Sequence, residues 1–256
     1  MKKLRKWFIR ILSTLLVLLS ILGIFVLKPS LLYAHKTKFE TFTVYHQRPL
    51  SRQVESLLNN AKVILKKSEI YNNAFKIDIC LNDGSYYPKL IQAMHDPAFG
   101  IGFYNKVVLM GKIDFDKNFV ELNGYKWNLT QLIAHEAIHC YQFKKFGLWK
   151  SNPVAGYAQW KWEGYNEYVA RQENDQLALA QNIERLVEAE KKDKNVWAIF
   201  FTDSTIAGKL YYKWWLQMQY CKDVKGMTYP AILKDTTNGE NIHTEMMTWY
   251  SKRNNY

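Results

Sequence analysis

The stretch NLTQLIAHEAIHCYQFKKFG, residues 128–147, carries the signals of a single helix with both ends marked. Asn128 and Gln131 have the spacing of a capping box, which is typical of a helix start. Two lysines would place positive charge in the last turn, and Gly147 is a typical residue just past a helix end. The mostly apolar residues between these ends predict a largely buried helix.

Two histidines four residues apart lie within this helix, and a glutamate follows the first of them. On one helix face, His135 and His139 could both reach the same cation. Glu136 could then act as a general base toward a water molecule in the open position of that cation. The alternative is an ordinary helix with one buried and one exposed histidine. The apolar surroundings weigh against it, because these polar groups would need partners in a buried stripe.

A third ligand is available shortly downstream, in WKWEGYNEY at residues 160–168. Glu163 and Glu167 are four residues apart and would face the same way on a helix. Glu163 could bind the metal, and Glu167 could accept a hydrogen bond from a ligand histidine. The alternative is a solvated acidic face, but the aromatic residues around the pair predict a packed helix.

The two motifs together resemble the gluzincin metallopeptidases, the group that contains thermolysin and aminopeptidase N. HEAIH at residues 135–139, followed by WEGYNEY at 162–168, is similar to the EG-x-x-EY form of small bacterial peptidase-like domains. The resemblance implies a zincin-like fold, one zinc ion per chain and a peptide or protein substrate. It also implies these roles: His135, His139 and Glu163 as zinc ligands, Glu136 as general base, and Glu167 as the acid that orients the first histidine.

The resemblance covers residues 128–170 and departs from the known patterns in three ways. The gap between His139 and Glu163 is longer than in thermolysin or the aminopeptidases, and Asn166 replaces a small residue. The glycine-rich motif that binds a substrate amino terminus in aminopeptidases is absent from the sequence. FGIGFYNKVVL at residues 99–109 is consistent with the edge strand that pairs with an extended peptide in such enzymes.

Zincins also use a tyrosine or histidine to stabilise the oxyanion of the tetrahedral intermediate. The candidates in this chain are Tyr211 and Tyr212 in GKLYYKWW, and His243. The sequence does not choose among them, because their positions depend on the fold.

The N-terminus predicts a membrane anchor. Basic residues open the chain and are followed by an apolar run that approaches the roughly 20 residues needed to span a bilayer. The flanking positive charges favour a cytoplasmic N-terminus and an extracellular or periplasmic catalytic domain. The predicted organisation is a cytoplasmic tail (1–6), a transmembrane signal anchor (7–27), a juxtamembrane linker (28–50) and a zincin-like catalytic domain (51–256).

A cleaved signal peptide followed by secretion is the alternative. Ala34 offers a cleavage point, but Leu32 is a poor match to the small residue expected two positions earlier. The apolar run is also long for a signal peptide, which favours the uncleaved anchor.

The order of the remaining patterns predicts an α+β domain with a small mixed sheet followed by helices. Residues 35–50 alternate like a strand or a linker. The other predicted segments are a helix at 52–68, strands at 75–81 and 100–115, and helices at 159–192 and 207–224.

Three cysteines suit an exported protein that does not depend on disulfides. Cys80 and Cys221 could form a bridge, but buried thiols are at least as consistent with the sequence. Cys140 lies beside the second histidine and is expected to be a core thiol that points away from the metal.

Two other functions fit parts of the pattern. A non-catalytic zincin-like domain could bind peptides or cell-envelope partners. A di-iron helical protein could use two Glu-x-x-His motifs, Glu136 with His139 and Glu240 with His243, bridged by Glu163 or Glu167. The strand-rich first half opposes that helical architecture.

The formal net charge of +12 does not predict nucleic-acid binding, because much of the excess lies at the N-terminus and the rest is mixed with acids. The sequence predicts no oligomeric state.

Overall fold

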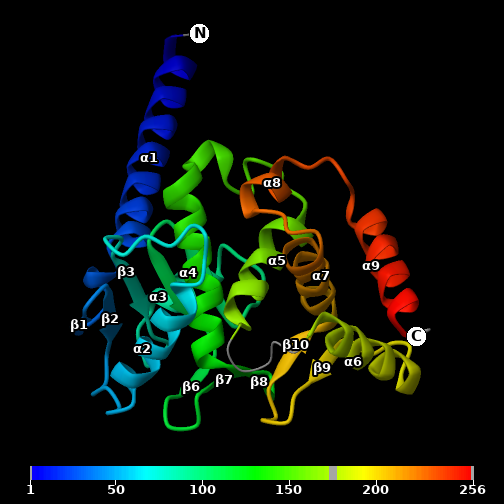
Figure 1. Ribbon diagram of the computed structural model, residues 1–256. Helices are drawn as coiled ribbons and strands as arrows, with labels where there is room; N and C mark the ends of the chain where they lie inside the picture. Colours follow the sequence, from blue (N-terminus) through cyan, green and yellow to red (C-terminus); the bar gives the residue numbers. More distant parts are fainter. Residues whose placement is uncertain (1, 173–177, 255–256) are drawn as a thin grey trace.

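The computed structural model describes residues 2–172 and 178–254 of the chain (Figure 1). Short 3₁₀ turns at Pro29–Leu31 and Leu148–Lys150 and a π-helical turn at Tyr220–Val224 join longer elements. Those longer elements are α1 (Lys2–Leu27), β1 (His35–Phe39), β2 (Phe42–His46), α2 (Val54–Leu65), β3 (Ile77–Cys80), α3 (Tyr87–Gln92), β4 (Gly100–Phe103), β5 (Lys106–Leu109), β6 (Lys112–Asp114), β7 (Phe119–Leu122), β8 (Tyr125–Asn128), α4 (Leu129–Phe146), α5 (Gln159–Ala170), α6 (Leu179–Lys192), β9 (Ala198–Phe200), β10 (Ile206–Gly208), α7 (Lys209–Gln219), α8 (Tyr229–Lys234) and α9 (Gly239–Asn254).

A five-stranded mixed sheet supports the helix that carries the two histidines. Its strand order is β1-β2-β3-β5-β4, with β2, β3 and β5 parallel and the two outer strands antiparallel to their neighbours. Successive side chains of β3 point to opposite faces, so that Ile79 joins the core with α2 and α4 while Cys80 joins a second cluster with Tyr87 of α3. Both faces of the sheet are therefore covered. The predicted α+β architecture with a small mixed sheet is confirmed.

The ends of α4 are those that the sequence predicts. The side-chain oxygen of Asn128 accepts a hydrogen bond of 3.1 Å from the backbone N–H of Gln131. At the other end Gly147 has a φ of 76°, which a glycine adopts without strain. Residues 131–138 of α4 are all buried, so packing and capping fix the same helix.

Asn128→Ala should lower the free energy of unfolding by about 1 kcal/mol, because the first turn of α4 loses its capping acceptor. Asn59→Ala is the matched control, since Asn59 lies exposed within α2, where alanine is a better helix former. Denaturant unfolding of the full chain in detergent would compare the two. Equal stability of both variants would contradict the role of the cap.

The segment predicted as a juxtamembrane linker at residues 28–50 is in fact part of the folded domain. It contains β1 and β2, and β2 pairs with β3 in parallel from Phe42 to Tyr45. Phe42 and Val44 are buried in the main core. The prediction was wrong about the boundary at residue 51, because a parallel strand pair depends on a partner about 35 residues away.

Helix α1 is long and apolar enough to cross a membrane. Its span Arg5–Leu27 has 23 residues, and the most apolar 18-residue window within it has a mean hydropathy of 2.5 and no residue buried in the protein. A signal sequence would have the same properties. The C-terminal end of α1 contacts the domain, where the hydroxyl of Tyr87 donates to the carbonyl of Val26 at 2.7 Å.

The helices after α4 form a layer that leads away from the sheet (Figure 1). Helix α5 packs on α4, α7 packs on α5, and α9 packs on α7. The contact between α5 and α7 depends on Gly164, where a Cβ atom would lie 2.6 Å from the carbonyl oxygen of Trp214. A side chain at this position would push α5 and α7 apart.

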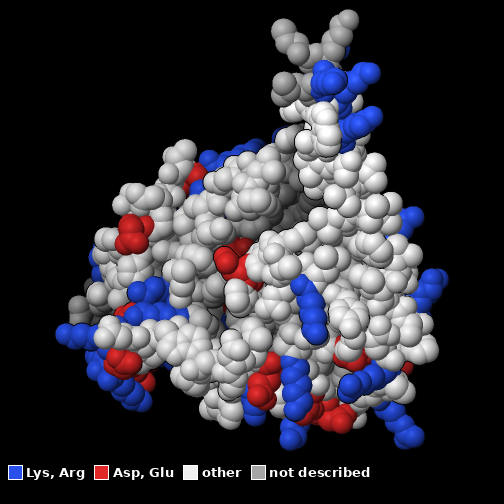
Figure 2. Space-filling view, turned by 180° about the vertical axis from the view of Figure 1, so that it is seen from behind, with Lys and Arg blue, Asp and Glu red and all other residues white. Residues whose placement is uncertain are grey.

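Lys and Arg are spread over the surface. On the face seen in Figure 2 they lie at the end of α1 and around the lower margin of the domain, interspersed with acidic residues. No continuous basic patch crosses this face among the described residues.

Candidate metal centre

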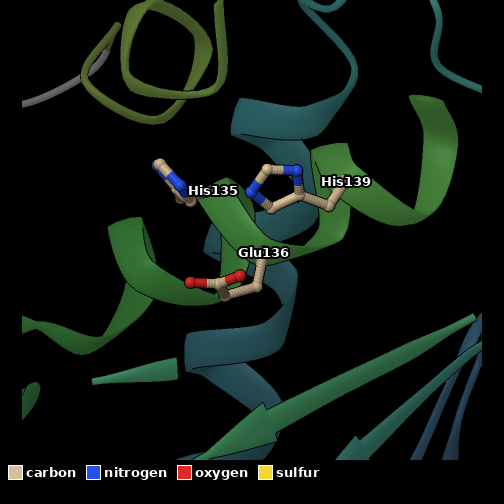
Figure 3. A group of neighbouring side chains, drawn as sticks. All are labelled: His135, Glu136 and His139. Carbon is tan, nitrogen blue, oxygen red and sulfur yellow. The ribbon is translucent and has the colours of Figure 1, made fainter. Parts of the chain in front are cut away.

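Three of the predicted site residues come from one stretch of α4 (Figure 3). His135 and Glu136 are buried and His139 is partly buried, and the two imidazole rings lie 5.3 Å apart between centroids. Possible ligand atoms of His135, Glu136 and His139 lie within 4.8 Å of one another. The spacing of one helical turn therefore brings the three side chains together, as predicted.

Glu163 of α5 faces the two histidines. Its Oε2 atom lies 3.2 Å from Nε2 of His135 and 3.3 Å from Nε2 of His139. Ligand atoms of a tetrahedral zinc site with bonds of about 2.0–2.1 Å lie about 3.3–3.4 Å from one another. The distances from the Glu163 oxygen to the two histidine nitrogens are close to this separation, so the carboxylate and each histidine are placed as ligands of one small cation would be.

The charge on Glu163 also suits a cation. Burial alone would raise the pKa of this carboxyl, but His139 and His135 lower the pKa well below its usual range. The carboxylate is therefore ionised, which is the form that binds metals. Burial would lower the pKa of His135, but Glu163 and Glu167 raise it, so metal binding would release protons from the histidines.

Glu167 lies behind the first histidine and is itself held by an arginine. Its Oε1 atom is 2.9 Å from Nδ1 of His135, and its Oε2 atom is 2.6 Å from Nε of Arg171. Burial would raise the pKa of Glu167, but Arg171 and His135 lower it to about 2. With Nδ1 engaged in this way, His135 presents Nε2 toward Glu163.

The second histidine has amide partners that the sequence did not predict. Nδ1 of His139 lies 3.1 Å from Oε1 of Gln142, and Nε2 lies 2.9 Å from Nδ2 of Asn166. The two amides also bond to each other at 2.9 Å. A cation on Nε2 would take the lone pair that Asn166 now contacts, so that amide would have to donate elsewhere. The sequence signal for these amides was their spacing: Gln142 follows His139 by three residues, and Asn166 follows Glu163 by three residues.

Strand β4 packs against α4 beside Glu136 and is one of the two edge strands of the sheet. A Cβ atom at Gly100 would lie 3.1 Å from Cγ of Glu136, and one at Gly102 would lie 2.9 Å from Cβ of His139. Glycines therefore permit the close approach of strand and helix. Burial raises the pKa of Glu136, although both histidines and a hydrogen bond with the Gly102 backbone act in the opposite direction.

Only one of the three predicted oxyanion candidates lies at this site. The ring centroid of Tyr211 is 6.2 Å from that of His135, and burial followed by the nearby Glu163 raises the pKa of its hydroxyl. Tyr212 is fully buried, and its hydroxyl donates to the carbonyl of Asn182 at 3.1 Å. His243 lies on α9 and lines a separate pocket. The structure thus gives neither Tyr212 nor His243 a place beside the histidines.

The three cysteines take no part in the site. Cys80, Cys140 and Cys221 are all free and buried, so the possible bridge between Cys80 and Cys221 is not formed. The thiol of Cys140 faces the carbonyl of Lys106 on β5 at 3.4 Å, away from the ligand atoms. This agrees with its prediction as a core thiol.

No protein-family model matches the chain, and it has no match among curated proteins or solved structures. The chemistry of the site therefore has to follow from its own geometry.

Proposed function

We propose that the chain is a membrane-anchored, zinc-dependent peptidase of the gluzincin type. The observation that carries the proposal is the Glu163 carboxylate, whose Oε2 atom lies 3.2 and 3.3 Å from the two Nε2 atoms. Two histidines at i and i+4 with a glutamate from a neighbouring helix form a ligand set that leaves one position of zinc open. His135, His139 and Glu163 would hold one zinc ion per chain.

The surrounding side chains support hydrolysis. When bound, zinc would polarise the scissile carbonyl and lower the pKa of a water molecule. Glu136 would accept a proton from the attacking water, and the pKa raised by burial makes it a stronger base. It would then give the proton to the leaving nitrogen. The hydroxyl of Tyr211 stays protonated at neutral pH and could donate to the carbonyl oxygen as negative charge develops there.

The edge of the sheet suggests how a peptide would bind. In the described sheet β4 has a strand neighbour on one side only, and it lies against Glu136. An extended peptide could add to the free edge of β4 through backbone hydrogen bonds. Its scissile bond would then pass close to the glutamate and the histidines.

The anchored form is favoured over the secreted one by the residues before Ala34. Pro29 and Tyr33 are buried, and the hydroxyl of Tyr33 donates to the carbonyl of Leu81 at 2.8 Å. Cleavage at Ala34 would remove these contacts from the folded domain. We therefore propose that α1 stays attached, with a cytoplasmic N-terminus and an exported catalytic domain.

The di-iron alternative receives less support. Glu240 and His243 lie on α9 and line a pocket that includes none of the groups around His135. A non-catalytic binding domain would use the same zinc site and differs in the role of Glu136.

Metal analysis tests the proposal most directly. The full chain, purified in detergent without chelators, should contain about one zinc ion per molecule, as a single three-ligand site requires. Elemental analysis by mass spectrometry would measure this ratio. Iron at a ratio of about two per chain would favour the di-iron alternative. Protein without stoichiometric metal, even after zinc is added back, would contradict the proposal.

A further inference from the structure

The turn between α4 and α5 exposes three large apolar side chains. Leu148 is 52% exposed, Trp149 is 79% exposed and Val154 is 51% exposed. Of the large apolar side chains in the described residues, that of Trp149 is the most exposed. Exposed apolar side chains gathered within a few residues are typical of a surface that binds a protein or a membrane. We call residues 147–157 the α4–α5 turn.

The domain holds this turn in one shape. Asn152 closes it, because its side-chain amide donates to the carbonyl of Tyr157 and its side-chain oxygen accepts from the backbone N–H of Tyr157, each at 2.8 Å. The ring of Tyr157 stacks on that of Trp162 in α5, with 5.5 Å between the centroids. One side of the turn is therefore fixed to the domain, and the three exposed side chains lie outside the main core.

The segment around the turn carries positive charge and no acidic residue. Residues 137–162 contain four lysines and neither aspartate nor glutamate. Three of these lysines are exposed, namely Lys144, Lys145 and Lys150, and the last adjoins Trp149. Apolar side chains flanked by lysines are typical of a segment that lies in the interface of a membrane with anionic lipids.

The residues that follow α1 are bonded into the domain. The hydroxyl of Tyr87 donates to the carbonyl of Val26 at 2.7 Å, and that of Ser85 donates to the carbonyl of Leu32 at 2.8 Å. Val26 and Leu32 also pack against the cluster that contains Tyr33 and Tyr87. The face of the domain around the end of α1 must therefore lie close to any bilayer that α1 crosses.

The α4–α5 turn lies on the side of the domain from which α1 emerges. In Figure 1, α1 and the C-terminal end of α4 both point toward the top of the view, whereas β6 to β9 lie at the opposite end of the domain. Tryptophan is enriched at the membrane–water interface, because its ring is apolar and its N–H is polar. A bilayer crossed by α1 would therefore place a suitable environment next to Trp149.

We propose that the α4–α5 turn is a membrane-docking loop. Leu148, Trp149 and Val154 enter the interface of the bilayer that α1 crosses, and the three exposed lysines lie at anionic lipid headgroups. This second attachment fixes the orientation of the domain relative to the bilayer. The inference rests on the membrane anchor of the proposed function, but it does not depend on peptide hydrolysis.

A nitroxide spin label on Val154→Cys would measure the depth of the turn. The full chain is placed in nanodiscs of phosphatidylcholine and phosphatidylglycerol, and collisions are measured with oxygen, which concentrates in lipid, and with a nickel chelate, which stays in water. Oxygen should relax this label more than the nickel chelate does. The unaltered protein is the blank for labelling, because its three cysteines are buried.

Trp197→Cys is the matched position for the label. Trp197 is also 51% exposed, and β9, which follows it directly, lies at the end of the domain away from α1 (Figure 1). Its label should be relaxed more by the nickel chelate than by oxygen. The two labels thus share the same starting exposure and differ in the side of the domain that they report on.

Trp149→Ser in the labelled Val154→Cys chain should move the label toward water, because it removes the largest apolar side chain of the turn. Trp197→Ser in the same chain makes the same change at the other end of the domain and should leave the depth unchanged. Nanodiscs of phosphatidylcholine alone should also make the label shallower, since the lysines lose their anionic partners.

A label on Leu19→Cys, within the apolar span of α1, separates this inference from the anchor. If that label lies in lipid while the Val154 label is as open to water as the Trp197 label, the anchor stands and the docking loop is overturned. A Val154 label shielded from both relaxants would show that a protein surface, such as a second copy of the chain, covers the turn, and this also overturns the proposal. A Leu19 label in water would overturn the anchor and the docking together. Loss of the peptidase function alone would change none of these results.

Discussion

Glu136→Gln is expected to keep the zinc ion and to lose peptide hydrolysis. The substitution preserves the size of the side chain but removes the carboxylate that accepts the proton of the attacking water. General-base catalysis contributes about 10²–10⁴-fold to a rate, so kcat should fall by that factor. Glu136 is 6% exposed, and the variant amide can still accept from the Gly102 backbone, so the fold should not change. Kinetics on a peptide library and metal analysis of the same sample would measure both effects.

Glu188→Gln makes the same chemical change at an exposed position of α6 and should behave like the unaltered protein. The pair also excludes a contaminating protease, whose activity would survive in both variants. Hydrolysis retained by Glu136→Gln at the full rate would show that this glutamate is not the base. If neither the unaltered protein nor Glu136→Gln hydrolyses peptides, and Glu136→Gln keeps the full biological effect of the unaltered protein, the non-catalytic binding domain would be favoured.

The helix with the histidines could be predicted because its signals are local. Asn128, Gln131 and Gly147 mark its ends through contacts within a few residues, and these contacts are present in the structure. The spacing of His135 and His139 has the same local origin. Helix geometry alone places such residues on one face.

The sheet could be predicted only in part, because its two parallel pairings, β2 with β3 and β3 with β5, join strands that are distant in sequence. The sequence of residues 35–50 is consistent with a strand or a linker, and in the structure β1 has exposed or half-buried residues on both faces. Its partner β2 lies parallel to β3, a pairing that no turn signal announces. The edge position of β4 followed from family resemblance and not from the residues themselves.

Within the site, sequence predicted the acidic groups and missed the amides. Tyr211 and Tyr212 are adjacent and chemically identical. Which of them faces the histidines depends on how α7 is rotated about its axis where it packs on α5. Asn166 and Gln142 carry no charge and belong to no metal motif, yet they contact both nitrogens of His139. Such partners depend on how two helices pack. The packing of α5 depends in turn on Gly164, which lies against Trp214, 50 residues later in the sequence.

Glu163→Gln should release the zinc ion and abolish hydrolysis with it. The carboxamide carries no charge and is a poor ligand, so two histidines alone would remain to hold the cation. Glu167→Gln is the matched comparison, because it makes the same change one turn later on α5. Glu167 contacts Nδ1 of His135 and not the ligand atom, so its loss should weaken zinc binding by only about 10–100-fold. Competition with a chromophoric chelator would measure the affinities of both variants.

Zinc binding by Glu163→Gln and by Glu136→Gln, compared with each other, decides which carboxylate is the third ligand. Glu136 has a ligand atom within 4.8 Å of those of both histidines, so proximity alone would allow it to replace Glu163. The two assignments predict opposite patterns. If Glu163 is the ligand, Glu163→Gln loses zinc and Glu136→Gln keeps it; if Glu136 is the ligand, the results are exchanged. Glu163 is favoured because its Oε2 atom is nearly equidistant from the two Nε2 atoms and its pKa is lowered, whereas burial raises the pKa of Glu136. A base must hold a proton during the reaction, and a ligand must not.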